Sequence, residues 1–229
     1  MKIAVIPARG GSKRIPRKNI RAFHGQPIIA YSIEAALRSD LFDRVIVSTD
    51  DEEIAAVALE HGAEAPFRRP ATLADDHTGT NAVARHAIGW FGQQGQPVTE
   101  VCCLYATAPF VTPQDLRDAR ALLEPALDFV FAATRFRFPV QRALVRNALG
   151  QVEPMFPQWI GARSQDLPEA VHDAGQFYWG WPAAFLHHDV PFLARAATYE
   201  LPSHRVQDID TLEDWTRAEL LYQLASDKS

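Results

Sequence analysis

Cysteine is almost absent from the sequence, and histidine does not occur in a metal-binding pattern. The only two cysteines, Cys102 and Cys103, are adjacent within an apolar run, which is typical of small core residues on opposite faces of a strand. This excludes a disulfide scaffold and a cysteine-based zinc site. None of the eight histidines forms an H-x-x-x-H pair with a carboxylate between them, so we expect no histidine metal centre.

Long hydrophobic runs and a positive net charge are also missing. No apolar run approaches the ~20 residues of a membrane-spanning helix, and the chain enters a short Ile3-Ala4-Val5-Ile6 run in place of a charged leader. The formal net charge of -5 disfavours a generally basic protein that binds nucleic acid or membrane surfaces. We therefore expect a cytoplasmic protein with neither nucleic acid nor membrane as a partner.

Four short apolar runs, separated by helical patterns, define the predicted fold. The runs are continuous enough for buried strands and too short for helices: 2–6, 44–47, 100–104 and 129–133. Helices are expected after Pro27, after a capping pair of Asp50 with Glu53, over about 80–91 and 113–123, and over a final apolar stripe at 212–222. This alternation predicts one α/β domain over 1–229, with a doubly wound, mostly parallel sheet and right-handed crossovers.

The stretch 134–172 lacks a helical stripe and mixes Arg, Phe, Pro and Gln around 135–139. This composition is typical of an inserted β-arm that projects from the sheet. Such an arm cannot bury its large apolar side chains on itself, so we expect it to form the centre of a two-fold homodimer. The side chains in question are Phe136, Phe138, Met155, Phe156 and Trp159.

A glycine-rich basic loop follows the first predicted strand. Residues 6–20 read IPARGGSKRIPRKNI, and five bases fall within ten positions: Arg9, Lys13, Arg14, Arg17 and Lys18. Ligands bind at the carboxyl edge of such a sheet, so the loop is placed to surround phosphates with backbone N–H groups and positive charge. The alternative is a solvated, flexible loop. The loop matches neither the P-loop pattern nor the dinucleotide-binding G-x-G-x-x-G pattern.

Two aspartates precede the last predicted helix. Asp208 and Asp210 are i and i+2 of an extended segment, so their carboxylates share one face, with Cα atoms about 6–7 Å apart. Such a pair suits Mg2+, which takes hard oxygen ligands and completes its shell with water and phosphate. The alternative is that Asp210 caps the helix, with Glu213 three residues on, which would explain Asp210 but not Asp208.

The pattern A-R-x-x-S-K-x-x-x-x-K-N at 8–19 resembles the nucleotide-binding loop of the CMP-N-acetylneuraminic acid synthetase (acylneuraminate cytidylyltransferase) family. More narrowly, LYATAPF at 104–110 and DAGQFYWG at 173–180 resemble the bacterial members that act on pseudaminic acid. The resemblance runs from the first strand to Trp215 and implies a Rossmann-like nucleotidyltransferase fold. It implies transfer of CMP from CTP to the anomeric hydroxyl of a nine-carbon 2-ulosonic acid, which we expect to be pseudaminic acid, with release of pyrophosphate.

The resemblance also implies roles for individual residues. The loop positions that hold the CTP triphosphate and ribose are matched by Arg9, Ser12, Lys13, Lys18 and Asn19, and an arginine near the nucleotide is matched by Arg69. The predicted catalytic residues are Arg9 and Lys13 on the phosphates and Asp208 and Asp210 on Mg2+. The predicted acceptor-binding residues are Tyr105, Thr107, Gln165, Gln176 and Tyr178.

The choice of acceptor follows from a departure from the family pattern. Sialic acid enzymes have Gln-Pro-Thr-Ser-Pro-Leu-Arg where this chain has YATAPFV at 105–111. We interpret Tyr105, Ala106, Ala108, Phe110 and Val111 as an apolar wall that favours the methyl and N-acyl groups of pseudaminic acid. The alternatives are the same reaction on sialic, legionaminic or another ulosonic acid, and a non-catalytic CTP-binding regulator.

Overall fold

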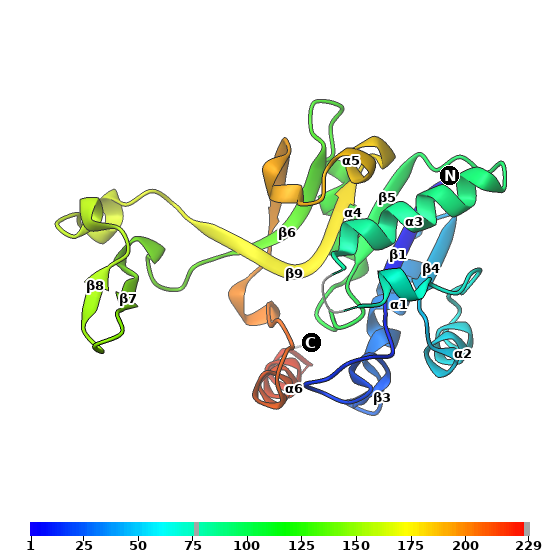
Figure 1. Cartoon of the computed structure of the whole chain (residues 1–229), viewed down its shortest axis with the longest axis horizontal. Helices are drawn as coiled ribbons and strands as arrows, with labels where there is room; N and C mark the ends of the chain where they lie inside the picture. The colour runs from blue at the N-terminus through cyan, green and yellow to red at the C-terminus, as the bar shows by residue number, and fades with distance from the viewer. Residues whose placement is uncertain (76–77, 227–229) are drawn as a thin grey trace.

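A six-stranded sheet forms the centre of the computed structural model, which describes residues 1–75 and 78–226 (Figure 1). The strand order is β10-β6-β9-β5-β1-β4. The parallel pairs join β1 (Lys2–Pro7) to β4 (Arg44–Ser48) and β5 (Glu100–Leu104), and β6 (Phe129–Arg135) to β10 (Ala196–Glu200). β9 (Val171–Gly180) lies antiparallel between β5 and β6. The predicted mostly parallel sheet and its four predicted strands are confirmed, and β9 and β10 are additions.

Helices cover both faces of the sheet, as a doubly wound fold requires. One face carries α1 (Ile28–Arg38), α2 (Glu52–Glu60) and α4 (Pro113–Ala121), and the other carries α3 (Thr80–Gln93) and α5 (Pro182–His187). Side-chain alternation along β1 explains the two cores, because Ala4 and Ile6 join one and Ile3 and Val5 the other. The last helix, α6 (Leu212–Ser226), covers a third apolar cluster that includes the short β2 (Ala22–Phe23).

Local capping chemistry fixes where the helices begin. Thr112 and Asp115 form a complete capping box at α4, as the Thr112-Pro113 start predicts. At α2 the predicted capping pair of Asp50 with Glu53 is wrong by one residue. Asp51 is the cap, and its carboxylate accepts from the N–H groups of Glu53 and Ile54, both at 3.0 Å. Asp50 instead accepts from the N–H of Gly10 at 3.0 Å.

The arm projects from the sheet between β6 and β9 (Figure 1). Its far part carries a hairpin of β7 (Leu144–Arg146) and β8 (Val152–Pro154). The predicted bounds of 134–172 are slightly too wide, because Thr134 and Arg135 still pair with His172 and Val171 in the sheet. The arm itself therefore spans 136–170, and its role in a dimer stays a prediction.

A bulge bends β9 where it passes the end of β5. Phe131 pairs with Tyr178, but Ala133 pairs with Asp173, so three extra residues of β9 lie between the two pairs. Gly175 lies within this bulge with φ of 61°, a conformation that favours glycine. The bulge directs residues of β9 toward the carboxyl edge of β5.

Within the described ranges, no helix combines the length and the apolarity needed to cross a bilayer.

The crowding of β9 between two strands can be tested at Gly180. A Cβ at this position would lie 2.7 Å from Cδ1 of Phe129 and 3.0 Å from the carbonyl oxygen of Asp128. We expect Gly180→Ala to lower the free energy of unfolding by about 1–3 kcal/mol, because a packed core resists added volume. The control is Gly92→Ala in α3, where nothing lies within 4 Å of the added atom, and which should raise it by about 0.5–1 kcal/mol. Urea denaturation measures both, and equal effects would contradict the packing described.

Candidate active site

The basic loop after β1 is built into the fold. The N–H of Gly10 is held by Asp50, and the side-chain amide of Asn19 donates to the carbonyl of Arg9 at 2.9 Å. Glycine suits position 10, because a Cβ there would lie 2.7 Å from Oδ2 of Asp51 and would require that side chain to shift. Ile15 is 1% exposed, in the apolar cluster beneath α6. These contacts disfavour the alternative of a solvated, flexible loop.

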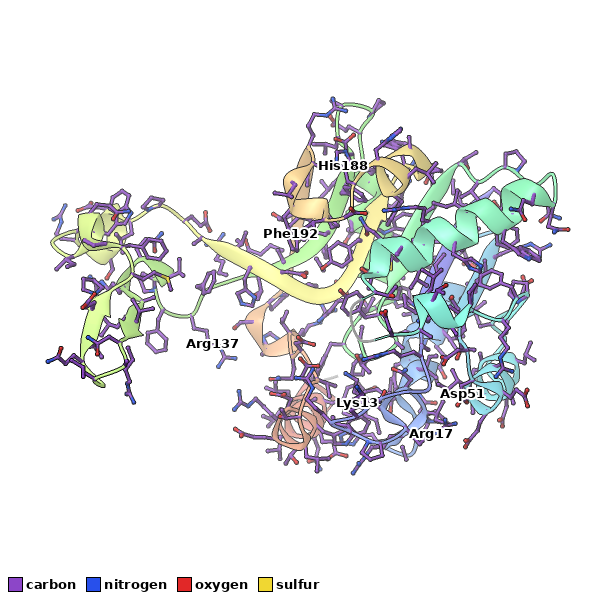
Figure 2. All side chains as sticks on the ribbon, in the orientation of Figure 1. Lys13, Arg17, Asp51, Arg137, His188 and Phe192 are labelled. Atoms are coloured by element: carbon purple, nitrogen blue, oxygen red, sulfur yellow. The ribbon has the colours of Figure 1, made fainter. Side chains whose placement is uncertain are left out.

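Arg17 holds the loop to α2 and does not line the cavity described below. Its guanidinium donates to both carboxylate oxygens of Asp51, at 2.5 and 3.0 Å, and also pairs with Glu53. The hydrogen bonds from Arg17 lower the pKa of Asp51 to about 2. Figure 2 shows Arg17 beside Asp51, with Lys13 nearer to α6. Of the five bases of the loop, Arg17 therefore holds the loop in place and does not contribute to the lining of the cavity.

A cavity of about 270 Å³ lies between this loop, the residues after β5 and the start of α3. It opens at the carboxyl edge of the parallel strands, where ligands of α/β proteins bind. The structure thus brings together residues from four distant parts of the chain. The predicted site residues that line the cavity are Arg9, Ser12, Lys13, Lys18, Asn19, Arg69, Tyr105, Thr107 and Asp210.

Residues at and just before the start of α3 also line the cavity and were not predicted from the sequence. Asp75, Thr78 and Thr80 also line the cavity, and Thr80 is the first residue of α3. The N-terminus of a helix carries unsatisfied N–H groups and a partial positive charge, which favour a bound anion. The available signal was the run of short polar residues immediately before a predicted helix.

Arg69 is a buried cation in the wall of the cavity. It is 4% exposed, and its guanidinium donates to both the hydroxyl and the carbonyl oxygen of Ser48. Burial lowers the pKa of Arg69 to about 10, opposed by the carboxylate of Asp50, so the side chain stays protonated at neutral pH. A buried charge is costly unless an opposite charge compensates it. An anionic ligand in the cavity would provide that compensation.

Asp210 is bound by two cations of the loop. Its Oδ1 lies 2.8 Å from Nη2 of Arg14 and 3.6 Å from Nζ of Lys18. Lys18 also donates to the carbonyl of the preceding residue, Ile209, at 2.5 Å. The loop and the segment before α6 therefore meet at the edge of the cavity, although they lie far apart in the sequence.

The helix-capping alternative for Asp210 is wrong. Thr211 and Asp214 form the hydrogen bonds of a capping box at the start of α6: the Thr211 hydroxyl accepts from the N–H of Asp214 at 3.2 Å, and Asp214 accepts from the N–H of Thr211 at 2.8 Å. Asp214 also accepts from the N–H of Asp210 at 3.2 Å. Glu213 instead pairs with Arg217. The carboxylate of Asp210 is thus left for the loop and the cavity.

Asp208 lies next to the bulge of β9. A Cβ added to Gly175 would be 3.8 Å from Cγ of Asp208 and 3.9 Å from Cε2 of Tyr105, so these groups form one wall. Partial burial raises the pKa of Asp208, and the neighbouring charge of Asp210 raises it further. Asp208 does not line the 270 Å³ cavity itself. The two carboxylates are close enough to repel each other, and a cation between them would relieve that repulsion.

The predicted acceptor-binding residues have different surroundings. Tyr178 is 3% exposed, donates its hydroxyl proton to Asp173, and has its ring 5.9 Å from that of Tyr105. Burial raises the pKa of both Tyr105 and Tyr178, Tyr105 to about 12, so both are protonated at neutral pH. Gln176 is 2% exposed and donates its amide to the carbonyl of Arg205 at 2.7 Å. Asp173 was not predicted, and its carboxylate holds Tyr178 and the N–H of Gly175 together.

Gln165 is not brought to the cavity within one chain. It lies on an exposed turn, Ser164–Asp166, in the arm. The acceptor-binding roles of Gln165, Gln176 and Tyr178 stay predictions.

The predicted apolar wall is wrong for Phe110 and Val111. Both are buried and line a different cavity of about 640 Å³, between α1, α4 and α6. Ala108 is 1% exposed in the core. Of the five residues of the predicted wall, only Tyr105 and Ala106 line the 270 Å³ cavity. Successive residues of an irregular loop do not alternate between faces as strand residues do, so the sequence could not show which side each one takes.

The fold and the site are those of a nucleotidyltransferase: a cavity lined by cations opens at the carboxyl edge of a doubly wound sheet, and the carboxylate of Asp210 lies in its lining. A family model described as cytidylyltransferase matches residues 3–135. The chain is also 47% identical over 223 residues to the pseudaminic acid cytidylyltransferase of Campylobacter jejuni, across 97% of this chain and 96% of that protein. The chain belongs to the cytidylyltransferase family, and its prediction as a CTP-dependent nucleotidyltransferase is confirmed.

Two further comparisons agree with this assignment. The chain is 34% identical over 209 residues to a Helicobacter pylori protein named pseudaminic acid cytidylyltransferase and UDP-2,4-diacetamido-2,4,6-trideoxy-beta-L-altropyranose hydrolase, across 90% of this chain and 40% of that protein. Among solved structures, CMP:2-keto-3-deoxy-manno-octonic acid synthetase complexed with CTP matches 98% of this chain and 99% of its own, with a TM-score of 0.71 at 18% identity. The structural likeness confirms the nucleotidyltransferase fold.

The ion pair between Arg17 and Asp51 predicts a pH dependence of stability. Asp51 has a pKa of about 2 in the folded protein, against about 3.9 in an unfolded chain. A carboxyl group whose pKa is lower in the folded state stabilises the fold above its unfolded pKa, and this contribution is lost as the pH falls through its folded pKa. At neutral pH we expect Asp51→Asn to lower the free energy of unfolding by about 1–3 kcal/mol.

Urea denaturation of wild type and Asp51→Asn at several pH values between 7 and 3 measures this difference. The gap between the two proteins should shrink as the pH falls below about 4, because Asp51 of the unfolded wild type takes up a proton there while the folded carboxylate, with its lower pKa, is still ionised. Glu60→Gln, at the exposed end of the same helix, is the matched control. A gap that stays constant over the whole range would show that the ion pair does not stabilise the loop.

Proposed function

We propose that the protein transfers CMP from CTP to the anomeric hydroxyl of a nine-carbon 2-ulosonic acid, pseudaminic acid, and releases pyrophosphate. The observation that carries this proposal is the cavity in which Arg9, Lys13 and Lys18 of one loop meet the buried Arg69 and the carboxylate of Asp210. Similarity to the Campylobacter jejuni pseudaminic acid cytidylyltransferase over nearly the whole of both chains supports this acceptor.

The reaction is an attack of the anomeric oxygen on the α-phosphorus of CTP, in which a new P–O bond forms and the bond to pyrophosphate breaks. An anomeric hydroxyl is a weak nucleophile and the leaving group is highly charged, so the protein mainly aligns the reactants and stabilises negative charge. Arg9 and Lys13 would neutralise the transferring and leaving phosphates, Ser12 would donate to phosphate oxygens, and Asn19 and Lys18 would contact the nucleotide from the end of the loop.

We further propose that Asp208 and Asp210 hold Mg2+. The residues fit this ion: two carboxylates lie on one short segment, the charge of Asp210 raises the pKa of Asp208, and Arg14 and Lys18 are already drawn to Asp210. In the described part of the chain no group of three or more histidine, cysteine or acidic side chains could hold a metal ion. The pair would therefore leave positions for water and phosphate oxygens, as Mg2+ sites usually do. Bound there, Mg2+ supplies neutralisation of phosphate charge and a lower pKa for the acceptor hydroxyl or a bound water.

Two other functions fit part of the site. The same reaction on sialic, legionaminic or another ulosonic acid needs only a different acceptor pocket. A CTP-binding regulator without turnover needs the cationic loop but no carboxylates beside it, so the position of Asp208 and Asp210 favours the enzyme. Membership of the cytidylyltransferase family favours it as well.

The acceptor is tested by supplying CTP, Mg2+ and a panel of ulosonic acids and analysing the products by mass. Tyr105 and Ala106 give the cavity a less polar side than the Gln-Pro of sialic acid enzymes, and each buried hydroxyl left without a partner costs about 1–3 kcal/mol. We expect kcat/KM for pseudaminic acid to exceed that for N-acetylneuraminic acid by roughly 100-fold or more. Comparable values would overturn the acceptor and leave cytidylyl transfer intact. A failure to release pyrophosphate with any acid would overturn the enzymatic function.

The role of Lys13 is tested by Lys13→Ala. Loss of one preorganised donor to charge in the transition state should lower kcat by roughly 100- to 1,000-fold. The fold should persist, because Lys13 lies on the surface of the loop and Ile15 anchors the loop. Lys2→Ala, at the other end of β1, is the matched control and should leave kcat unchanged. A kcat near the wild-type value for Lys13→Ala would remove Lys13 from the mechanism.

We propose that the arm forms a homodimer. It projects away from the sheet (Figure 1). It also exposes large apolar side chains, including Phe138 at 83%, Leu149 at 82% and Ile160 at 66%. Exposed apolar surface of this kind marks an interface, and a two-fold interface buries the same surface on both copies. Gln165 would then reach the acceptor side of the partner's cavity, which it does not reach in its own chain.

Light scattering at micromolar concentration tests the dimer. We expect the wild type to have the mass of two chains, and Ile160→Asp to have the mass of one and lower activity, because a buried charge opposes association. Leu59→Asp places the same charge on α2, where Leu59 is 60% exposed and lies outside the arm, and should leave the dimer intact. A wild-type monomer with full activity would refute the dimer and the role of Gln165.

The cytoplasmic location and the lack of nucleic-acid and membrane partners stay predictions. They are supported by the net charge of -5 and by the position of four of the five loop bases, Arg9, Lys13, Arg14 and Lys18, in the lining of one small cavity.

A further inference from the structure

An ion pair between a buried acid and a half-buried arginine, outside the 270 Å³ cavity, fixes the segment that carries Asp208 and Asp210. Its acid is Asp115, which is 3% exposed and belongs to the capping box of α4. The Oδ2 atom of Asp115 accepts from the N–H of Thr112 at 2.8 Å and from its hydroxyl at 2.6 Å. These contacts complete the cap, and a neutral side-chain oxygen could make them equally well. The negative charge of Asp115 therefore needs another explanation.

Arg205 supplies the opposite charge from a distant part of the chain. Its guanidinium donates to both carboxylate oxygens of Asp115 and to the carbonyl of Phe110, the last at 2.9 Å. The hydroxyl of Tyr199 also donates to Asp115, at 3.1 Å. Arginine suits this place because its planar fork fixes both its distance and its orientation to a carboxylate.

The path from Arg205 to the two aspartates is short and held at both ends. The carbonyl of Arg205 accepts from the amide of Gln176 at 2.7 Å, and the carbonyl of Ile209 accepts from Lys18 at 2.5 Å. Ile209 is fully buried in the cluster beneath α6. Asp208 lies between these two anchors and Asp210 directly follows the second. Loss of the Arg205 anchor would release the side of the segment that leads to Asp208, while Ile209 would still hold Asp210 in place.

We propose that Asp115 and Arg205 are positioning residues, which set the separation of the Asp208 and Asp210 carboxylates for a divalent cation, with Gln176 holding the backbone at Arg205. This inference rests on the proposed function, because it concerns the proposed metal pair. A purely structural role would change stability and leave cation affinity as it is.

The test measures Mn2+ binding to the full chain without CTP, by electron paramagnetic resonance of the free ion. Asp115→Asn keeps an oxygen for Thr112 and loses the charge that holds Arg205. We expect it to bind Mn2+ about 10- to 100-fold more weakly than wild type, the usual effect of losing a partner that orients metal ligands. Its affinity for CTP without metal, measured by calorimetry, should be unchanged, because Asp115 and Arg205 do not line the 270 Å³ cavity, where we propose that CTP binds.

Tyr199→Phe is the matched control, since it removes a hydrogen bond to the same carboxylate and leaves Arg205 in place. It should lower the melting temperature and bind Mn2+ as the wild type does. If Asp115→Asn does not fold, Arg205→Lys replaces it, because lysine keeps the charge and loses the two-pronged geometry; it should also weaken Mn2+ binding.

The outcomes separate this inference from the proposed metal site. Wild-type Mn2+ affinity in a folded Asp115→Asn or Arg205→Lys would overturn the positioning role, provided that Asp208→Asn abolishes binding. If Asp208→Asn binds Mn2+ as tightly as wild type, or wild type does not bind it, the proposed metal site is overturned and this inference with it. Weak binding in Asp115→Asn together with wild-type binding in Tyr199→Phe supports the proposal.

Discussion

Mutual repulsion among the cations of one loop is the constraint on which this site depends. Carboxylates at the ends of neighbouring elements offset this repulsion: Asp51 forms an ion pair with Arg17, and Asp210 forms ion pairs with Arg14 and Lys18. Asp50 and Asp51 are in position because β1 and β4 run in parallel, with Pro7 opposite Ser48, so that both strands end at the same edge. The acids thus hold Arg17, Arg14 and Lys18 apart, and Arg9 and Lys13 line the 270 Å³ cavity together with Arg69. A chain of net charge -5 can in this way maintain a local site for a highly charged anion.

Most of the sheet could be predicted because its signals are local. Each of the four predicted strands is an uninterrupted apolar run, and the loop after β1 follows directly from the first of them. β9 was not predicted, since its ten residues mix Asp, Gln and Gly with aromatics and its partners lie more than thirty positions away along the chain. Its place between two strands that could otherwise have paired is decided by long-range packing, which no single window of sequence contains.

In the site, too, some features could be predicted from local sequence and others depend on the folded structure. The loop bases and the aspartate pair could be found from residue type and position, and Arg69 from the family resemblance. All of these but Arg17 and Asp208 line one cavity. The roles that could not be predicted depend on the direction of a side chain. Asp50 and Asp51 are adjacent acids at one helix start, and only the folded loop shows that Asp51 caps α2 while Asp50 holds Gly10. In the same way, Phe110 lies only three residues from Thr107, yet the two residues line different cavities.

The ion pairs of Asp210 have a thermodynamic consequence for the order of binding. Lys18 lines the 270 Å³ cavity and also contacts Asp210. An anion bound in the cavity would attract Lys18 and so weaken the ion pair between Lys18 and Asp210. The divalent cation proposed to bind Asp210 would compete with Lys18 and Arg14 for its carboxylate and so would release them toward the phosphate oxygens of the nucleotide. Each of the two ligands would therefore draw Lys18 away from Asp210, which is the change that the other ligand requires. By thermodynamic linkage, each ligand would raise the affinity for the other by the same factor. Because Asp210 is 41% and Arg14 64% exposed, solvent screens these pairs and each contributes about 0–1 kcal/mol. A coupling of this size would leave the free site stable and would still let the proposed nucleotide and metal bind together more readily than either binds alone.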